Sequence, residues 1–494
     1  VTTRGLPRDL RKVISVKQMS EDPAIKNILI TGGVDIKCCA FDQTGDIRFY
    51  LSRVVKGYGI FPTSRGHYIF MEKAKCNATW TNPQCSVYHD MDYLGRVHKT
   101  YLSDNGLHHT IEEKVNGNLL IGTNTVDTEY CEDAMAEVDC HTGEIVWELH
   151  FEDLFGGAYK DMTDWAHINS AVYNKENNTM LISLRNVHAV ICVDYDTKKL
   201  RWIMSDPEFW KGTPVEDLVL QPVGDIKWFY QQHSAFWVKE DMDGNPDTRQ
   251  IMMFDNHWHK RRPAKSFDGD MKYSYISFYS VNEKEKTVSL LHRVPCRKSQ
   301  IRGNGIYLHE QKRVYSMEGA FAKKYQESVG EWIGGIYEYD YETGEQLSEI
   351  LVKPGFFRAY EFKPELEDLS QPQEQNEAYL LGNLKKPVVM EEKDKEGISF
   401  DGRKISKQAL RYQLREKCLF IREVDHHLKK VYFHGKEHDY ILHLDTTEQV
   451  YGTYFGHSTH YLSMEIDELP KDYYEIYVNY DGDFGYTGKY IQIG

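Results

Sequence analysis

The segment DWAHINSAVYNKENNTMLISLRNVHAVICVDYDTKKLRW, residues 164–202, contains four short runs rich in β-branched and aromatic residues. The polar turn formers KENN and YDTKK separate these runs, which is the pattern of a four-stranded antiparallel sheet. Other parts of the chain repeat this design. A repeated four-stranded unit predicts a β-propeller, in which the innermost strands begin around one central channel.

An acidic or amide residue followed by a turn and a further strand recurs along the chain, at intervals of roughly 50 residues with one longer gap. These turns begin at Asp42, Asp92, Asp139, Asp194, Asn282 and Asp340. In each copy the turn is expected to join the last two strands of a unit. We therefore expect an all-β chain with a six-bladed β-propeller over residues 25–385. An unrelated sandwich that uses common turn sequences is the alternative.

The rest of the chain divides into smaller parts. Residues 1–24 form an N-terminal segment, and residues 203–230 are expected to cross one rim of the propeller. The polar, acidic stretch 362–398 predicts a linker, and the helical spacing within 403–417 predicts a short helix. Apolar and polar residues alternate again after the helix, so residues 386–494 are expected to hold linker, helix and a small antiparallel β domain, sandwich-like in form.

Composition argues against several classes of protein. The 494 residues carry a formal net charge of −15, which disfavours a nucleic-acid partner and an anionic membrane surface. No apolar run reaches the roughly 18 residues of a membrane span. The first residues, VTTRGLPRDLRKVISVKQ, lack the apolar core of a signal peptide, which slightly favours the cytoplasm over an exported location.

Cysteine and histidine spacing gives no sign of a metal site. The nine cysteines are irregularly spaced and form no CxxC pair, so neither a disulfide scaffold nor structural zinc is expected. Cys76 and Cys85 flank one loop and could pair if the protein is exported. Asp425, His426 and His427 are adjacent in an expected strand, where neighbouring side chains point to opposite faces. We therefore predict no metal.

Several strings resemble the bacterial arylsulfate sulfotransferases, and the likeness covers about residues 25–360. The strings include LHHTIEEKVNGNLLIG, EDAMAEVDCHTGEIVWEL, DWAHINSAVY, LQPVGDIKWFYQQHSAF and MMFDN. DWxHxNS, QHS and FDN, in this order and at blade spacing, make a fairly specific combination. The resemblance implies a six-bladed propeller that moves a sulfuryl group from an aryl sulfate ester to a phenol. It implies passage through a sulfated histidine, without a nucleotide or other cofactor.

The resemblance also assigns roles to individual residues. It implies that His167 of DWAHINS and His233 of QQHSAF are active-site histidines. The arginine that follows FDN in the family matches Arg261, although its neighbours Arg262 and Lys260 could fill the same slot.

The nucleophilic histidine of the family falls on the segment Val314–Gln326, which contains no histidine. The nearest alternatives are His309, Tyr315 and Tyr325. A covalent histidine mechanism therefore has no residue assigned to its central step.

The chemistry of the transferred group indicates further candidates. A sulfuryl group is anionic and its transition state is loose, so a site needs cationic or N–H donors around the sulfate oxygens. Neutral imidazole is a nucleophile near neutral pH, and imidazolium is an acid. His109, Asn169 and Arg358 lie where strands are expected to begin, and Arg185 could reach the channel from the end of its strand; we take these four as substrate-binding candidates. Each could instead have a structural role.

Two functions stay open from the sequence. The chain is an arylsulfate sulfotransferase that takes a small aryl sulfate and a phenol, or it is a propeller that binds sulfate esters or a protein partner without turnover. Hydrolysis is disfavoured because the Cys-x-Pro-x-Arg pattern of sulfatases is absent. Whether the chain forms a homo-oligomer is also left open.

Overall fold

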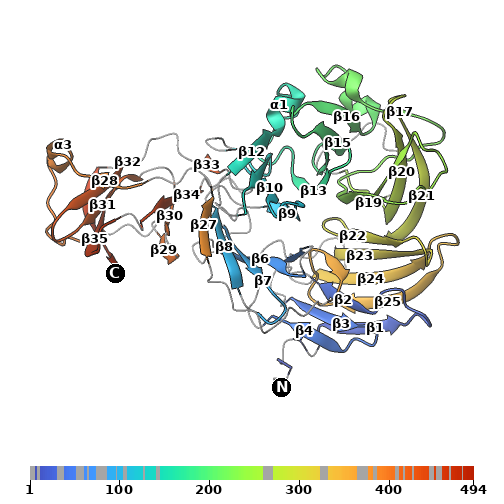
Figure 1. Cartoon of the computed structure of the whole chain (residues 1–494), viewed down its shortest axis with the longest axis horizontal. Coiled ribbons are helices and arrows are strands. Elements are labelled where there is room, and N and C mark those ends of the chain that lie inside the picture. Colours follow the sequence, from blue (N-terminus) through green and yellow to red (C-terminus); the bar gives the residue numbers. More distant parts are fainter. Residues whose placement is uncertain are drawn as a thin grey trace.

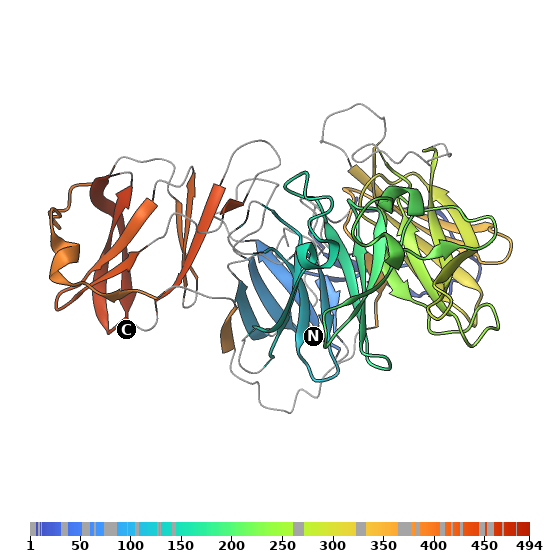
Figure 2. The ribbon, with the colours of Figure 1, turned by 90° about the horizontal axis from the view of Figure 1, so that it is seen from above.

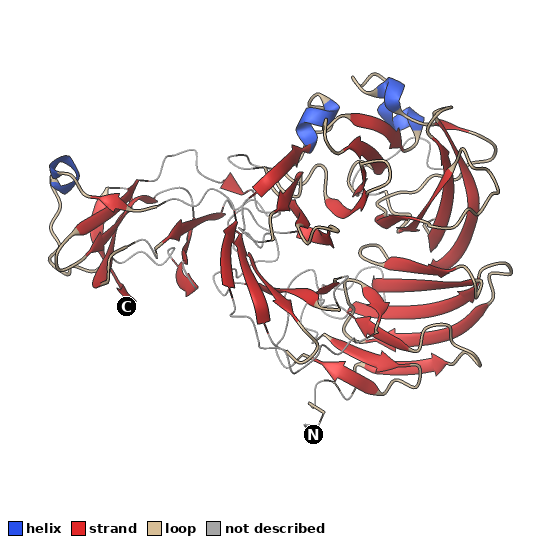
Figure 3. Cartoon of the chain, viewed as in Figure 1, coloured by secondary structure: helices blue, strands red, loops and turns tan. Residues whose placement is uncertain are grey.

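The computed structural model describes most of the chain. The described residues are 6–7, 10, 12–30, 38–51, 60–63, 66–73, 86–95, 97–103, 108–125, 128, 130–140, 145–259, 271–322, 332–363, 377–381, 386–405, 411–415, 418–424, 428–443, 450–451, 459–466, 469–480 and 482–494. Strands dominate this part of the chain, and the helices are few and short (Figure 3). The prediction of an all-β chain is confirmed. None of these helices combines the length and apolar character that a membrane crossing requires.

Six sheets of four or five strands stand around a common centre in Figure 1, among the described residues up to Leu381. The strands of the first sheet are, in hydrogen-bonded order, β26 (Ala359–Glu361), β2 (Asn27–Ile30), β3 (Cys39–Asp42) and β4 (Ile47–Tyr50). Those of the second are β5 (Ile60–Pro62), β6 (Tyr68–Lys73), β7 (Ser86–Met91), β8 (Val97–Ser103) and β27 (Glu377–Leu381). Those of the third are β9 (His108–Glu113), β10 (Leu119–Thr123), β11 (Ala134–Val138) and β12 (Ile145–His150).

The other three sheets follow in the same region of the chain. The strands of the fourth sheet are β13 (Ile168–Asn174), β14 (Thr179–Leu184), β15 (Ala189–Asp194) and β16 (Leu200–Met204). Those of the fifth are β18 (His233–Trp237), β19 (Arg249–Asp255), β20 (Tyr273–Asn282), β21 (Thr287–Arg297) and β17 (Gln221–Pro222). Those of the sixth are β22 (Asn304–Leu308), β23 (Arg313–Ala322), β24 (Trp332–Asp340), β25 (Gln346–Val352) and β1 (Ile14–Gln18). Strands β9, β13 and β22 lie near the centre in Figure 1.

The six predicted turns lie where they were expected. They join β3 to β4, β7 to β8, β11 to β12, β15 to β16, β20 to β21 and β24 to β25, the last two strands of each antiparallel run. At Asp194 the carboxylate accepts hydrogen bonds from the amide and hydroxyl of Thr197 at 2.9 and 2.8 Å. Asp340 accepts from Thr343 in the same way, at 2.9 and 3.0 Å. These turn predictions are confirmed.

Both ends of this region supply strands to sheets built mainly by the other end. β26 pairs with β2, with Ala359 opposite Ile30, and β1 pairs with β25, with Ile14 opposite Val352. β1 belongs to the part of the chain expected as an N-terminal segment. β27, which runs parallel to β8, comes from the stretch expected as a linker. These pairings join residues far apart in sequence, so local periodicity does not reveal them.

Neighbouring sheets pack face to face through alternate residues of their strands. All six residues of β14 are buried. Met180, Ile182 and Leu184 pack in one apolar cluster with residues of the β9–β12 sheet. Leu181 packs in another cluster, with Ile251 of the β17–β21 sheet. Because both faces of the sheet are covered, its middle strands read as continuous apolar runs.

A half-buried carboxyl group links two of these sheets. Glu112 of β9 accepts a hydrogen bond from the backbone amide of Tyr173 in β13 at 2.8 Å. Burial opposes its ionisation, outweighing the Tyr173 amide and the Lys114 charge, and raises the pKa of Glu112 to about 8. The folded protein therefore keeps a proton that the unfolded chain releases near pH 4.3.

We expect Glu112→Gln to flatten the pH dependence of stability. With a folded pKa above the unfolded value, the group's stabilising contribution is complete below about pH 4.3 and declines as pH rises towards about 8. Glutamine keeps an oxygen acceptor for Tyr173 without a titrating proton. Thermal melts should show the variant gaining stability over wild type between pH 5 and pH 9. The exposed Glu176→Gln is the control and should not change the slope. If the melting temperature changed with pH to the same degree in wild type, Glu112→Gln and Glu176→Gln, this account would be contradicted.

The predicted crossing over residues 203–230 contains more regular structure than expected. It holds α2 (Pro207–Trp210), the short 3₁₀ helix η1 (Glu216–Leu218) and β17, which pairs in parallel with β21. Trp210 of α2 packs on Phe155 of α1 (Phe151–Phe155), with ring centroids 5.3 Å apart. The crossing is thus anchored by aromatic contacts to the preceding sheet.

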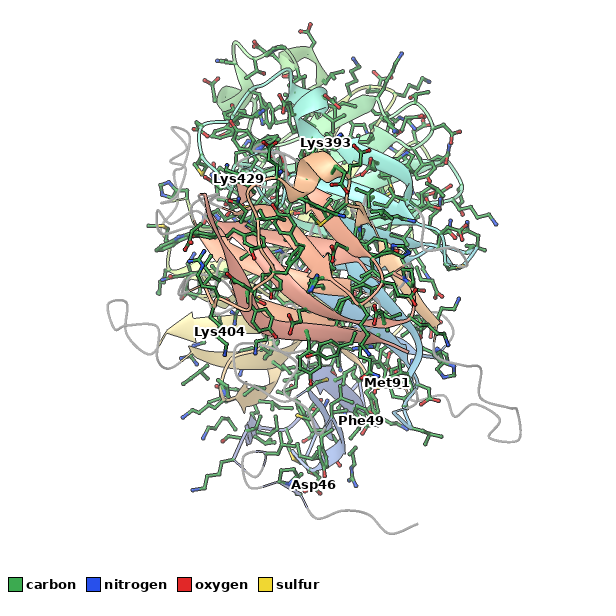
Figure 4. All side chains as sticks on the ribbon, turned by 90° about the vertical axis from the view of Figure 1, so that its left-hand side faces the viewer. Asp46, Phe49, Met91, Lys393, Lys404 and Lys429 are labelled. Atoms are coloured by element: carbon green, nitrogen blue, oxygen red, sulfur yellow. The ribbon has the colours of Figure 1, made fainter. Side chains whose placement is uncertain are left out.

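Two further sheets follow and lie to one side of the six in Figures 1 and 2. One comprises β28 (Val388–Val389), β32 (Asp439–His443), β31 (Leu428–His434), β35 (Asp472–Tyr480) and β36 (Asp483–Ile493); the other comprises β29 (Arg411–Arg415), β30 (Cys418–Val424), β34 (Thr459–Glu465) and β33 (Val450–Tyr451). Figure 4 looks onto these two sheets, and the labelled Lys393 and Lys404 lie above and below them in that view.

The helix predicted within 403–417 is wrong for the residues of this range that the structure describes. Residues Arg411–Arg415 form β29, which pairs antiparallel with β30, with Arg411 opposite Arg422. Pairing with a neighbouring strand overrides a weak local helical pattern. A short helix, α3, occurs earlier, at Glu392–Lys395, where Glu391 and Asp394 form a capping box.

Candidate functional site

Six of the seven predicted site residues lie in one buried cluster where the inner strands begin. The rings of His109 and His167 lie 4.8 Å apart between centroids. Arg185 is close enough to lower the pKa of both His167 and His233, and Arg358 also lowers that of His233. The Arg358 guanidinium donates to the backbone carbonyl of Asn169. These residues, His109, Asn169, His167, Arg185, His233 and Arg358, come from four different sheets or the segments that lead into them. Arg261, with Lys260 and Arg262, lies outside the described residues.

The entries to several inner strands have a left-handed backbone. The φ angles of His109, His167 and Ser234 are 54°, 56° and 55°, although none of these residues is glycine. Such a conformation costs a β-carbon-bearing residue on the order of 1 kcal/mol or more. The surrounding fold therefore holds the backbone of these site residues in a strained but fixed geometry.

His167 lies between two carboxylates. Its Nδ1 is 2.6 Å from Oε2 of Glu132 and 2.9 Å from Oδ1 of Asp164. Burial disfavours a charged ring, but the Asp164 and Glu132 charges prevail and raise the pKa of His167. The backbone fixes this arrangement, because the Ile168 amide donates to the Glu132 carbonyl at 3.0 Å.

His233 has the opposite electrostatic environment. Burial, followed by the charges of Arg185 and His167, lowers the pKa of His233 well below its ordinary value, so the ring is neutral. Nδ1 lies 2.6 Å from Oδ1 of Asn256. The Nε2 atom faces the backbone amide of Arg302 at 3.3 Å.

The amide group of Asn256 determines the tautomer of His233. Its Nδ2 donates to the carbonyls of Ser299 and Arg302, each at 2.9 Å, so its oxygen must face the ring. An oxygen acceptor requires Nδ1 of His233 to carry the proton. The lone pair therefore lies on Nε2, and the ring offers an acceptor or nucleophile there instead of a proton.

Asn169 and Gln232 hold two sheets together beside these rings. Asn169 donates through Nδ2 to the Gln232 carbonyl at 2.6 Å and accepts from the Ser234 amide at 3.3 Å. Gln232 in turn donates to the Ala189 carbonyl at 2.8 Å. The side chain of Asn169 is thus engaged in positioning the strand that carries His233.

The FDN motif ends in a buried ionic group. Asp255 accepts from the amides of Tyr230 and His257 at 3.0 and 2.7 Å, and from Arg293 Nη2 at 2.5 Å. Burial opposes the charge on this carboxylate, but His257 and Arg293 overcome it and lower the pKa of Asp255 to about 2. Asp255 therefore anchors the turn from which Asn256 reaches His233.

The residues considered as replacement nucleophiles lie away from this cluster where they are described. The Tyr315 hydroxyl accepts from the Ile25 amide at 3.0 Å, and its ring is buried in the apolar core between the first and last sheets. His309 follows β22 and bonds the Tyr307 hydroxyl at 3.1 Å. Five residues of extended chain place it roughly 16 Å from the start of that strand. Tyr325 lies outside the described residues, as do Cys76, Cys85 and the Asp425–His427 group.

Sequence reasoning missed three supporting residues. Asp164 and Asn256 stand inside the quoted motifs DWAHINS and FDN, and Glu132 stands inside EDAMAEVD. The residues themselves stand in those motifs, but only the structure shows which histidine each of them contacts. Together they determine the proton positions on the two histidines.

Comparisons with known proteins agree with the resemblance seen in the sequence. The profile of the family described as Arylsulfotransferase (ASST) matches residues 14–361. The arylsulfate sulfotransferase AssT of Escherichia coli is 26% identical over 213 residues, covering 38% of this chain and 33% of the relative. AssT of Lelliottia amnigena is 25% identical over 213 residues, which again cover 38% of this chain and 33% of the relative. The matched part thus spans about a third of the length of these curated relatives.

The solved structures to which the chain is similar are more distant. The periplasmic gluconolactonase PpgL of Pseudomonas aeruginosa is 11% identical, with a TM-score of 0.40, covering 69% of this chain and 100% of that one. Hydrazine synthase of Kuenenia stuttgartiensis is 9% identical, with a TM-score of 0.34, covering 75% of this chain and 77% of that one.

Proposed function

Because this chain belongs to the arylsulfotransferase family, we propose that it transfers a sulfuryl group from an aryl sulfate ester to a phenolic acceptor without a nucleotide cofactor. We propose further that its six sheets are the blades of a six-bladed β-propeller over residues 25–385, and that residues 386–494 form a separate small β domain. The observation that carries the proposal is the meeting of imidazole and guanidinium groups from different sheets at one end of the inner strands.

The two buried arginines support binding of an anionic group. Arg185 and Arg358 are only 7% and 3% exposed. A guanidinium group presents a planar set of N–H donors that suits two oxygens of a tetrahedral anion. In our proposal these arginines, with His109 and His167, contact the sulfate oxygens, and Arg261 stays a further candidate. Positive charge fixed in a buried site stabilises the transferring group in its transition state.

We assign the covalent step to His233, since the segment Val314–Gln326 contains no histidine. The neutral ring with its lone pair on Nε2 supports this assignment. Nε2 forms a bond to sulfur, the bond from sulfur to the aryl oxygen breaks, and the phenolate leaves with that electron pair. The acceptor phenol then attacks the sulfur, its hydroxyl proton passes to the released phenolate, and the bond from sulfur to Nε2 breaks with its electron pair returning to the ring. The step requires Nε2 to give up its contact with the Arg302 amide.

The proposed activity predicts release of a chromogenic phenol that depends on an acceptor. Incubation with p-nitrophenyl sulfate should yield nitrophenol at a rate that rises with added phenol, together with the sulfated acceptor as second product. Absorbance measures the first product and mass spectrometry the second. A complete lack of acceptor-dependent release between about pH 6 and pH 10 would exclude this function.

A second candidate function is binding of sulfate esters without turnover. It is favoured by one observation, the missing histidine in the segment that matches the nucleophile position. Calorimetry would then show heat of binding for an aryl sulfate, with the ester recovered intact. Detection of a sulfated histidine after brief incubation would reject this alternative.

A further inference from the structure

We propose that His109, Glu132 and His167 bind a divalent transition-metal cation, with Zn²⁺ as the representative ion. One ligand atom from each residue lies within 4.8 Å of the other two. Oε2 of Glu132 is 2.6 Å from Nδ1 of His167 and 3.5 Å from Nδ1 of His109. The side chains are 4%, 8% and 12% exposed for His109, Glu132 and His167, so the donors are largely shielded from water.

The spacing of the donors is close to that of a metal site. Bonds from zinc to nitrogen or oxygen are about 2.0–2.2 Å long, which places tetrahedral ligands about 3.4 Å apart. The distances from Glu132 to the two rings lie on either side of this value. Small side-chain movements, without a change in the backbone, would bring all three donors onto one ion.

The backbone around the three donors is fixed before any ion binds. The Glu132 amide donates to Asn124 Oδ1 at 2.7 Å, and the Glu132 carbonyl accepts from Ile168 at 3.0 Å. All three residues have left-handed φ angles, of 54° for His109, 57° for Glu132 and 56° for His167. Strained backbone is tolerated where the surroundings hold it, and it concentrates at functional sites.

The local charge also favours a cation, because two carboxylates, Glu132 and Asp164, act on the His167 ring against the single opposing charge of Arg185. Asp164 is a second carboxylate at the same ring nitrogen, with its oxygens 2.9 and 3.0 Å from His167 Nδ1. A ring nitrogen carries at most one proton, so Glu132 and Asp164 compete for a single donor. A dication satisfies both carboxylates at once. The alternative is that a protonated His167 alone holds the two acids, and the experiment below separates the two states.

The donor set indicates the class of cation. Two imidazoles and one carboxylate suit Zn²⁺, Co²⁺, Ni²⁺ or Fe²⁺, whereas Mg²⁺ and Ca²⁺ prefer oxygen ligands. The cation site does not depend on sulfuryl transfer. If both hold, the ion offsets two carboxylates that would otherwise repel a sulfate ester, and it becomes the positive contact in place of the His167 ring.

Titration of the metal-stripped 494-residue chain tests the proposal. After dialysis against EDTA, Co²⁺ should bind at one equivalent per chain, with visible absorption bands typical of a coordinated ion. Zn²⁺ should displace it, and Mg²⁺ should not. Glu132→Gln is isosteric, and His109→Ala removes one ring. Each variant should weaken Co²⁺ binding at least 10-fold.

A matched control addresses unspecific binding by surface histidines. His434 forms a comparable pair with Asp439, at 2.7 Å, in the C-terminal sheet. His434→Ala should leave the stoichiometric Co²⁺ signal intact. Thermal melts with and without Zn²⁺ supply a readout apart from absorbance, since the ion should raise the melting temperature of wild type and not of Glu132→Gln.

The proposal fails if Co²⁺ does not bind stoichiometrically, or if Glu132→Gln and His109→Ala bind it as wild type does. Because no sulfate ester is present, these outcomes are separate from those of the transfer assay. A protein that transfers sulfuryl groups but binds no Co²⁺ would overturn the metal site alone. A protein that binds one Co²⁺ but shows no transfer would support the metal site and overturn the proposed activity.

Discussion

Replacing Asp255 by alanine is expected to destabilise the fold by about 3–5 kcal/mol. The carboxylate is fully buried and accepts hydrogen bonds from two backbone amides and from Arg293. Its removal leaves the Arg293 charge, whose side chain is 15% exposed, without its partner at 2.5 Å. Urea denaturation followed by circular dichroism should show a lower midpoint for the variant.

A second variant separates the effect of losing the Asp255 charge from that of losing its hydrogen-bond acceptors, and a third serves as the control. Asp255→Asn keeps one oxygen for the amides of Tyr230 and His257 and removes the charge, so its stability should fall between wild type and Asp255→Ala. Asp225, whose side chain is 88% exposed, gives the control Asp225→Ala, which should change stability by less than about 0.5 kcal/mol. An Asp255→Ala midpoint equal to that of Asp225→Ala would contradict the proposed role.

The same carboxylate gives stability a defined pH window. The pKa of Asp255 in the folded protein, about 2, lies below the unfolded value of about 3.9. A depressed pKa contributes stability that is complete above the unfolded value and is lost as pH falls towards 2. Acidification from about pH 4 should therefore reduce the difference between wild type and Asp255→Asn.

The repeated units of this fold were predictable because their signals are local. The segment 164–202 contains β13–β15 and the start of β16, and the turns at Asp194 and Asp340 carry their own hydrogen-bonding side chains. The strands that join the two ends were not predictable. β26 has only three residues and β1 only five, and each takes its partner from the opposite end of the region.

The site shows the same division between local and non-local information. His167 and His233 stand in motifs that the sequence displays directly. Asp164 and Glu132 also stand in such motifs, but their contact with His167 does not show there: Glu132 comes from the segment before β11 and meets the ring only through the packing of two sheets. A search for regularly spaced cysteines predicted no metal. It could not detect three donors that lie in separate segments of the chain.

The largest effect on activity is expected from His233→Ala. If the ring carries the sulfuryl group, acceptor-dependent phenol release should fall by about 10³-fold or more, since an alanine side chain cannot form the bond to sulfur. Mass spectrometry of wild type quenched during turnover should place the added sulfuryl group on the peptide that contains His233. A sulfated peptide elsewhere would reject the assignment. His309→Ala, a histidine outside the cluster, is the control and should retain activity.

Asn256→Asp tests the tautomer argument through the pH dependence of the rate. In wild type, burial and the charges of Arg185, His167 and Arg358 lower the pKa of His233, so the ring stays neutral well below its ordinary titration range. The acidic limb of the rate profile should lie correspondingly low. A carboxylate 2.6 Å from Nδ1 would favour the imidazolium and raise the pKa, which removes the lone pair at higher pH. The acidic limb should therefore shift upward in Asn256→Asp, while a purely structural lesion would lower the rate equally at every pH. An unshifted profile would show that Asn256 does not control the protonation of His233.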